Sequence, residues 1–538
     1  MDKIIKGNIV DVHRRMIYPG KITISGKYIK DIVYDEECKG LTNYIVPGFV
    51  DSHIHIESTL LSPTEFSKLA VKYGTVATVS DPHEIANVLG LKGVDYMINE
   101  AKKSPLKFNF GAPSCVPATK FETAGAELNA LDVKILLERK EIKFLSEMMN
   151  WPGVLEEDVE VMAKIEAAKS LNKPVDGHAP GLSGEKAKLY ASKGITTDHE
   201  CTQLEEALDK IEGGMKIQIR EGSAAKNFDA LSTLLNSHAE HLMFCTDDTH
   251  PHELINGHID LFIRRAFELG ADIFEVLKIA SINPIEHYNL DVGQLRKGDL
   301  ADFVIVETMS QFIPIATYIN GEAVYENNEV KFTTEKPEVI NNFQAREKTV
   351  SEFFLDTKGK QVQSIVVEDG QLITKKEIFN STSLKANDVL KLAVVNRYRN
   401  EPPAIAFIKG IGLEQGAIAS TVAHDSHNII AVGHDDQVLC EAVNEVINMK
   451  GGLVITNGFD THSLPLPIAG LMSDKEGTDV AKDYINLLNK AKSFGSKLHD
   501  PFLTLSFVTL LVIPELKLSD KGLFDAKNFK FTNPLINS

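Results

Sequence analysis

Apolar runs that end in polar side chains alternate with amphipathic runs from about residue 44 to residue 290. Eight of these runs have the length and composition of strands: NYIVPGFVDSHIH, TVATVSDPHE, LKFNFGAPS, EIKFLSEMMN, PVDGHAP, ITTDHE, MKIQIREGS and HLMFCTDDTH. Stretches with helical spacing, such as PTEFSKLAVKYG and EEDVEVMAKIEAAKSLN, lie between several of them. An open α/β sheet would show the same alternation. Polar residues at all eight strand ends, within roughly 250 residues, favour an α/β fold of the (β/α)8 TIM-like barrel type.

Strand-like patterns also occur on both sides of this region. Near the N-terminus they form IIKGNIVDV and KITISGKYIKDIV, with a break expected at Tyr18-Pro19-Gly20. The same texture returns in ADFVIVE and PIATYINGEAVYE, after a turn at Lys297-Gly298-Asp299. We therefore expect three domains: a small composite β domain from both flanks (1–43 with 291–334), the barrel (44–290) and an additional C-terminal α+β domain (335–538).

Composition narrows the classes of partner. The formal net charge is −18, so the chain gains nothing from counterion release on a phosphate backbone, and neither nucleic acid nor a membrane is an expected partner. Five cysteines lie far apart without a CxxC pair, which argues for a reducing compartment. The first residues, MDKIIKGNIVDV, show no signal-peptide pattern, and the late apolar run FVTLLVIP is too short to cross a bilayer. The expected location is the cytoplasm.

The predicted strand ends carry the candidate chemistry. His53 and His55 are two apart at the end of the first strand, so both imidazoles can face one metal ion. His178 ends the fifth strand, His199 the sixth and Asp247 the eighth. Any one of these is more often a polar group that satisfies a loop backbone. Four imidazoles and a carboxylate at one end of one barrel suit a divalent first-row metal ion.

The fourth strand decides between one metal ion and two, because a second ion needs an anionic bridge. Lys143 and Glu147 share a strand face. Lys143 would first have to be carboxylated, so Glu147 is the favoured bridge, although it could also be a salt-bridged rim residue. A metal ion lowers the pKa of bound water towards ~7, and Asp247 could take up a proton as the hydroxide attacks. Without a phosphate loop, a nucleophile elbow or a redox fingerprint, the sequence predicts hydrolysis.

PGFVDSHIH followed by His178, His199 and Asp247 resembles the amidohydrolase superfamily. Further segments are similar to the bacterial and archaeal adenine deaminases, and they cover nearly the whole chain: DPHEIANVLG, FLSEMMNWPGV, GHAPGLSG, TTDHEC, DDTHP, GAIASTVAHDSHNI, LPLPIAGLMS and DPFLTLSFVTLLVIPELKLSDKGLFD. The resemblance implies hydrolytic deamination of adenine to hypoxanthine and ammonia, for purine salvage. It implies a binuclear centre of manganese or iron, and the ligands also suit zinc. By position the ligands would be His53, His55, Glu147, His178, His199 and Asp247.

Attack at C6 of the adenine ring needs a second acid or base. His83 or Glu84, at the second strand end, is the candidate, although Glu84 could instead cap the following helix. Asp248 and His250 are expected to face the ring or to support the ligands.

His424 and His427, in the HDSHN segment, are expected to bind substrate in a loop that covers the barrel mouth. The alternative is a turn held by its own hydrogen bonds.

Other functions stay open at this point. A cyclic-amide hydrolase of the dihydroorotase or hydantoinase kind could use the same metal core, and a catalytically inactive barrel could serve as a scaffold. The Glu147 context and the additional C-terminal domain (335–538) argue against the cyclic-amide hydrolase, and the filled ligand positions argue against the scaffold. A homo-oligomer is the default expectation.

Overall fold

The computed structural model describes residues 2–537, and the chain divides into two compact units. The first unit runs to Pro82 and resumes over Asp95–Ser114 and Asn129–Glu335, and the second comprises His83–Val94, Cys115–Leu128 and the chain from Lys336 onward. The two short segments of the second unit interrupt the barrel region, which the sequence does not indicate. Backbone contacts hold them there, since the Gly125 N–H donates to the Asn87 carbonyl at 2.7 Å.

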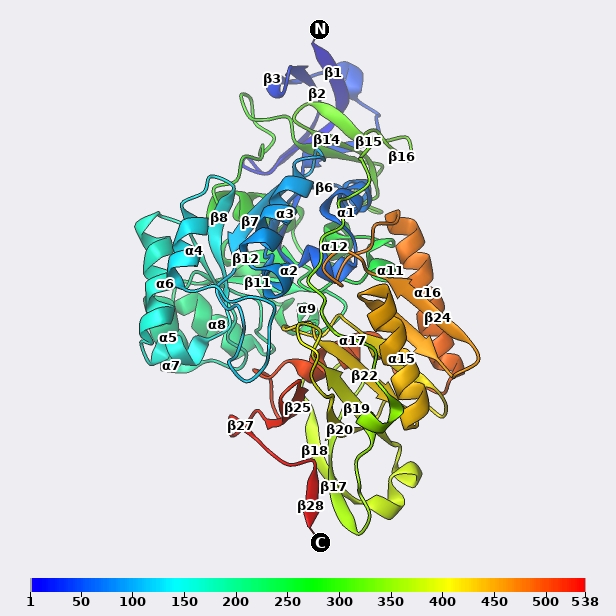
Figure 1. Cartoon of the computed structure of the whole chain (residues 1–538). Helices are drawn as coiled ribbons and strands as arrows, with labels where there is room; N and C mark the ends of the chain where they lie inside the picture. Colours follow the sequence, from blue (N-terminus) through cyan, green and yellow to red (C-terminus); the bar gives the residue numbers. More distant parts are fainter. Residues whose placement is uncertain (1, 538) are drawn as a thin grey trace. The chain divides into compact units, whose positions relative to one another are not determined.

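Eight parallel strands form a closed barrel in the first unit, and several of them are labelled in Figure 1. They are β5 (Phe49–Ile54), β6 (Thr75–Ser80), β7 (Lys107–Ala112), β8 (Ile142–Met148), β9 (Val175–Gly177), β10 (Thr197–Asp198), β11 (Lys216–Arg220) and β12 (Leu242–Cys245). Strands β5 to β9 pair in chain order, as do β10 to β12. Two contacts complete the ring: Thr196 N–H donates to the Val175 carbonyl (2.8 Å), and Asp247 N–H donates to the His53 carbonyl (2.9 Å). The predicted barrel fold is confirmed.

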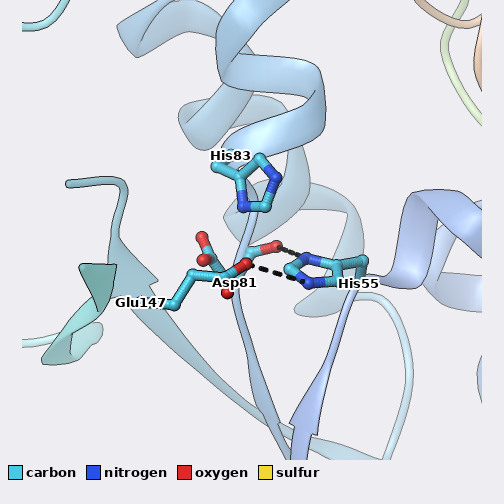
Figure 2. Close-up of side chains that lie close together, drawn as sticks. All are labelled: His55, Asp81, His83 and Glu147. Atoms are coloured by element: carbon cyan, nitrogen blue, oxygen red, sulfur yellow. Dashed lines mark hydrogen bonds and ion pairs between the residues drawn. The ribbon is translucent and has the colours of Figure 1, made fainter. Parts of the chain in front are cut away.

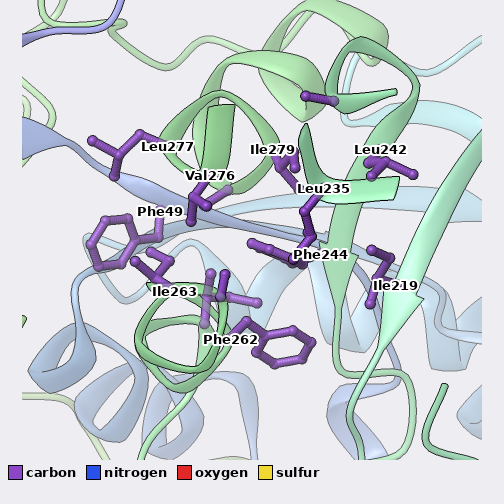
Figure 3. Packing of buried hydrophobic residues seen from close by; sticks show 14 of the residues in the cluster. Phe49, Ile219, Leu235, Leu242, Phe244, Phe262, Ile263, Val276, Leu277 and Ile279 are labelled. Carbon is purple, nitrogen blue, oxygen red and sulfur yellow. The ribbon is translucent and has the colours of Figure 1, made fainter. Parts of the chain in front are cut away.

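A helix follows each barrel strand along the chain. The main ones are α1 (Pro63–Ala70), α2 (His83–Leu89), α3 (Leu91–Ala101), α4 (Ala130–Leu137), α5 (Trp151–Leu155), α6 (Val159–Ser170), α7 (Gly184–Ser192), α8 (Leu204–Glu212), α9 (Phe228–Leu231), α11 (Pro251–Leu254) and α12 (Ile259–Glu268). Part of the core lies between strands and helices, where Ile219 of β11 and Phe244 of β12 pack with Phe262 of α12 (Figure 3).

Alternation along β11 decides which side chains face the barrel axis. Ile217 and Ile219 belong to the buried apolar cluster, so Gln218 and Arg220 face the other way. Gln218 Nε2 donates to the Ser52 carbonyl on β5 at 2.7 Å, across the barrel. Arg220 is therefore aimed inward at the mouth end of the seventh strand.

Strands from both flanks combine in one eight-stranded sheet of the first unit, in the order β16-β15-β14-β13-β4-β1-β2-β3. They are β1 (Lys3–Asp11), β2 (Met16–Ser25), β3 (Tyr28–Tyr34), β4 (Tyr44–Pro47), β13 (Phe303–Val306), β14 (Pro314–Ile319), β15 (Glu322–Glu326) and β16 (Glu329–Val330). The apolar run from residue 44 to residue 55 is thus two strands, β4 in this sheet and β5 in the barrel. Gly48 separates them, where a Cβ atom would lie 2.5 Å from Val76.

The break expected at Tyr18-Pro19-Gly20 was wrong. β2 runs through these residues, and the hairpin from β1 turns before Met16, with Arg15 at φ 54°. Partners on both sides override the turn preference of Pro and Gly: Pro19 lies opposite Asn8 and its carbonyl accepts the Asp35 N–H. Gly20 leaves room for the Val33 carbonyl, which a Cβ atom would approach to 2.7 Å.

A second large sheet lies in the second unit, in the order β18-β17-β20-β19-β22-β21-β23-β24, with β28 on β17. Its strands are β17 (Lys360–Val366), β18 (Lys375–Asn380), β19 (Val389–Val395), β20 (Ala404–Lys409), β21 (Ala417–Ser420), β22 (Ile429–Gly433), β23 (Gly452–Thr456), β24 (Thr461–Pro465) and β28 (Leu535–Asn537). A smaller sheet joins β25 (Leu516–Ser519), β26 (Gly522–Asp525) and β27 (Lys530–Phe531). The main helices are α15 (Asp436–Met449), α16 (Gly477–Ser493) and α17 (Pro501–Ser506), and α15 packs on β21 to β23. Within residues 2–537 we find no helix with the length and apolar character of a membrane span.

Candidate metal centre

The first strand presents two imidazoles to the carboxylate of the eighth. His53 Nε2 lies 3.5 Å and His55 Nε2 3.0 Å from Asp247 Oδ1. His55 Nδ1 lies 3.1 Å from the Asp81 carbonyl. A dashed line in Figure 2 marks this contact. A carbonyl only accepts, so Nδ1 carries the proton and Nε2 presents its lone pair to the site. This tautomer is the one that a metal ligand requires.

Glu147, near the end of β8, separates two groups of histidines. Its Oε1 lies 3.3 Å from His55 Nε2, on the side of the first strand (Figure 2). Its Oε2 lies 2.6 Å from His178 Nδ1 and 3.2 Å from His199 Nε2. One carboxylate thus turns one oxygen to each group, which is the geometry of a bridging ligand. Lys143, the other bridge candidate, instead pairs with Asp291: its Nζ lies 3.9 Å from Asp291 Oδ2.

The donor set fits a cation. The rings of His53 and His199 stack with centroids 4.2 Å apart, and both residues are fully buried. Neither ring nitrogen of either residue makes a hydrogen bond to the described part of the chain. A buried polar group left without a partner costs about 1–3 kcal/mol, and a metal ion removes that cost for the nitrogen that binds it. These buried His, Asp and Glu side chains are therefore consistent with a divalent metal site.

Charges at the centre keep both carboxylates ionised. Burial opposes ionisation of Glu147, but His178, His199 and His55 outweigh it and hold the pKa of this carboxyl well below its usual range. Burial opposes ionisation of Asp247 too, and Arg220 and the nearby imidazoles likewise hold its pKa well below the usual range. Both groups are thus anionic at neutral pH.

Two residues of this site, Arg220 and Glu200, were not predicted from the sequence. Arg220 Nη1 donates to Asp247 Oδ2 and to Glu200 Oε1, both at 2.5 Å. Glu200 Oε1 also lies 3.4 Å from His199 Nε2 and 3.6 Å from His178 Nδ1. Two signals were available: Arg220 ends the seventh strand, and Glu200 directly follows His199.

A buried ion-pair network supports the loops that carry His178 and His199. Lys210 Nζ, on α8, donates to the Ala179 carbonyl (2.8 Å), Asp198 Oδ1 (2.9 Å) and Glu206 Oε1 (2.9 Å). Asp198 accepts the N–H of Ala179 at 3.0 Å and that of Glu200 at 2.9 Å. The residues adjacent to both histidines are thus tied to one charged cluster.

Comparisons with known proteins place the chain in a family. The amidohydrolase family matches residues 44–324, and the adenine deaminase C-terminal domain matches residues 364–530. An adenine deaminase of Sulfurovum sp. (strain NBC37-1) is 51% identical over 98% of this chain and 98% of its own length. The chain belongs to the adenine deaminase family. Another adenine deaminase, from Salinibacter ruber, is 48% identical over 99% of both chains. Among solved structures, a beta-aspartyl dipeptidase of Fervidobacterium islandicum AW-1 covers 62% of this chain and 100% of its own at 16% identity, with a TM-score of 0.48.

Asp248 and His250, which were expected to face the ring or to support the ligands, lie in the first unit. The Asp248 carboxylate accepts a hydrogen bond from the Ser58 hydroxyl, and its charge contributes to raising the pKa of His55. His250 is buried at the start of α11, where its N–H donates to Ser223 Oγ at 2.8 Å. Their role in substrate binding stays a prediction.

The other four predicted site residues, His83, Glu84, His424 and His427, lie in the second unit. His83 begins α2, and its Nε2 lies 3.5 Å from Glu84 Oε1. Glu84 in turn contacts His424 and His427, from the loop between β21 and β22. The structure thus brings Glu84, His424 and His427 together. The sequence predicted an acid or base role for Glu84 and substrate binding for the two histidines.

Proposed function

We propose that this protein hydrolyses adenine to hypoxanthine and ammonia. One observation carries the proposal: Glu147 turns its two oxygens to two separate groups of imidazoles, in a chain 51% identical to an adenine deaminase over 98% of its length. Deamination by water needs a strong nucleophile at C6 and a way to protonate the leaving nitrogen. The residues at the barrel mouth can hold the cations for the first task and move the proton for the second.

We propose two divalent cations per chain, manganese or iron, with zinc as a possible substitute. His53, His55 and Asp247 would hold one, His178 and His199 the other, and Glu147 would bridge them. Such ions supply Lewis-acid activation of water near neutral pH. Glu200 is close enough to the second pair to assist it, at 3.4 Å from His199 Nε2.

Asp247 is the residue that would move the proton. Its Oδ2 is occupied by Arg220, while its Oδ1 faces His53 and His55. Arg220 thereby fixes the rotation of the carboxylate, so that Oδ1 accepts the proton of the attacking water and delivers it to the amino group at C6. Protonation lets that group leave as neutral ammonia.

A second acid or base would serve the ring nitrogen. Glu84 is three residues from Asp81, whose carbonyl contacts the metal-facing His55, so its Cα lies within about 11 Å of that of Asp81 by chain length alone. We therefore keep His83 and Glu84 as candidates for this step. His424, His427, Asp248 and His250 are proposed to contact the substrate.

The proposal is tested by ammonia release from adenine. Metal-depleted protein is reloaded with manganese or ferrous iron under anaerobic conditions, and bound metal is measured in the same samples. We expect turnover of adenine that rises to a maximum at two ions per chain. Ring opening of dihydroorotate or hydantoin, which releases no ammonia and is followed by chromatography, would refute the proposed substrate if adenine is not turned over. No turnover of any of these would favour a scaffold. A cytoplasmic location and a homo-oligomer stay predictions of the sequence.

A further inference from the structure

A cavity of about 880 Å³ lies at the end of the barrel opposite to the candidate metal centre. The first residues of β7 and β8 line it, together with the chain that follows α3 and turns of the flanking β sheet. All of its lining residues belong to the first unit. On β8, Lys143 of the cavity lies four residues before Glu147, which corresponds to about 13 Å along the strand. The cavity is therefore separate from the metal centre, and its size is within the range of pockets that hold small molecules.

Positive charge dominates the wall of this cavity. Two of the lining side chains are acidic, Glu141 and Asp291, and five are lysines: Lys27, Lys102, Lys107, Lys140 and Lys143. The whole chain carries a formal net charge of −18, so this concentration of cations is contrary to the overall composition. A hollow lined by one sign of charge attracts ions of the opposite sign.

The carboxylates near the cavity compensate only part of this charge. Lys143 Nζ lies 3.9 Å from Asp291 Oδ2, and the Asp291 side chain is 88% exposed. Such an exposed ion pair contributes little, because water screens it. Lys27 contacts the ring of Tyr28, 5.3 Å from its centroid. Within residues 2–537, neither Lys27 nor Lys140 forms an ion pair with a carboxylate. Two ammonium groups of the cavity are thus available to an anion.

Lys107 adds a cation that is largely buried, with its side chain 15% exposed. Its Nζ donates to Asp302 Oδ2 at 2.6 Å. The Asp302 carboxylate also accepts the N–H groups of Gly293 and Asn320, both at 2.8 Å, so it is shared among three donors. Burial lowers the pKa of Lys107, and the charge of Lys27 lowers it further. The two ammonium groups therefore repel each other, and a bound anion would remove this repulsion.

The remaining wall of the cavity is apolar and aromatic. Ile98, Leu106 and Phe108 contribute to it, and so does Tyr28, which is 47% exposed. The ring of Phe108 is stacked with that of Phe110, with centroids 5.9 Å apart and planes at 5°. A planar ring can pack against these side chains while anionic groups attached to it reach the lysines.

We propose that this cavity binds a nucleotide, with its phosphates on Lys27, Lys107, Lys140 and Lys143 and its base against the apolar wall. A lysine binds phosphate as a point charge on a flexible side chain, so the four ammonium groups can converge on one phosphate chain. The proposal goes beyond the proposed function and does not depend on it, because none of the residues at the metal centre takes part. Its test needs no turnover of adenine.

Isothermal titration calorimetry of the manganese-loaded protein with ADP tests the proposal. Pyrophosphate and adenosine are titrated separately, because each has only one half of the recognised chemistry. We expect ADP to bind about 10-fold more tightly than either fragment, since stacking of the base adds to the phosphate contacts, and more weakly as salt is raised. Bound manganese is measured after each titration. Equal affinities for ADP and pyrophosphate would overturn the nucleotide assignment, and no binding of ADP would overturn the site.

Variants show where the nucleotide binds. The double variant with Lys27→Met and Lys140→Met removes two lysines that have no carboxylate partner. Thermal unfolding should change little, while the affinity for ADP should fall by about 100-fold, or about 10-fold for each lysine. Asp291→Asn removes a competing negative charge and should tighten binding by about 2–5-fold.

The matched control is Lys169→Met, at a lysine of α6 outside the cavity that pairs with Glu166 at 3.3 Å. This variant should bind ADP as the wild type does. If the double variant at Lys27 and Lys140 binds ADP as tightly as the control, the nucleotide binds elsewhere on the protein and the proposal is wrong.

Discussion

Lys210 offers a test of how the second group of metal ligands is positioned. Its ammonium group is fully buried and donates three hydrogen bonds, two of them to the carboxylates of Asp198 and Glu206. Lys210→Met keeps the length of the side chain but leaves both carboxylates buried without their cation. Breaking a buried ion pair in this way costs about 3–5 kcal/mol.

Lys210→Met should also weaken metal binding. Asp198 precedes His199, and the Ala179 carbonyl bound by Lys210 follows His178. Groups that orient metal ligands from behind typically change metal affinity by about 10–100-fold when they are removed. We therefore expect Lys210→Met to retain about one manganese ion per chain where the wild type retains two, with weaker binding at the His178–His199 pair.

The matched control is Lys173→Met. Lys173 Nζ also donates to three groups, but these are the backbone carbonyls of Leu137, Arg139 and Ile142. Metal retention under titration with a chelator and urea unfolding by circular dichroism are measured for both variants. The control should lose stability with little change in metal affinity. If Lys210→Met binds manganese within twofold of the wild type while its stability falls, Lys210 does not position the ligands.

Three further predictions concern single side chains. Glu147→Gln removes the bridging charge, so bound metal should fall below two ions per chain by mass spectrometry, and two tightly held ions in the variant would count against the bridge. Asp247→Asn should abolish ammonia release, and a near-normal rate would remove Asp247 from the proposed proton transfer. Burial lowers the pKa of Lys517 to about 7, below its value in the unfolded chain. Unfolding therefore takes up a proton between about pH 7 and 10, and stability rises with pH there by up to about 1.4 kcal/mol per unit. Lys517→Met should flatten this rise in urea unfolding at pH 7 and pH 9, and an unchanged slope would refute the assignment.

The barrel and the clustering of the candidate ligands were predictable because strand ends are local signals. His53, His55 and Asp247 each follow an apolar run, and parallel strands bring such ends to one face of the barrel. Pro19 misled the prediction for the opposite reason. Its local preference is for a turn, but pairing with β1 and with the segment after β3 outweighs that preference.

The sequence pattern did not predict residues whose burial depends on distant segments. Glu206 and Lys210 are four apart on α8, which is the spacing of an ordinary exposed ion pair on a helix. The sequence gives no sign that Asp198 and the Ala179 carbonyl enclose them, yet Lys210 is fully buried. Arg220 could have been predicted in the same way as Asp247. It ends a strand, and it shares with Gln218 the strand face opposite the apolar Ile219.

The contact that closes the barrel has a consequence for biosynthesis. The Asp247 N–H bonds the His53 carbonyl, and the His55 N–H bonds the Asp247 carbonyl. The first and eighth strands therefore meet through a residue whose side chain faces the same two imidazoles. A nascent chain on the ribosome carries both histidines long before Asp247 is translated, so the proposed ligand set is complete only after the ring has closed. Under the proposed function, metal binding should accordingly follow synthesis of the whole barrel.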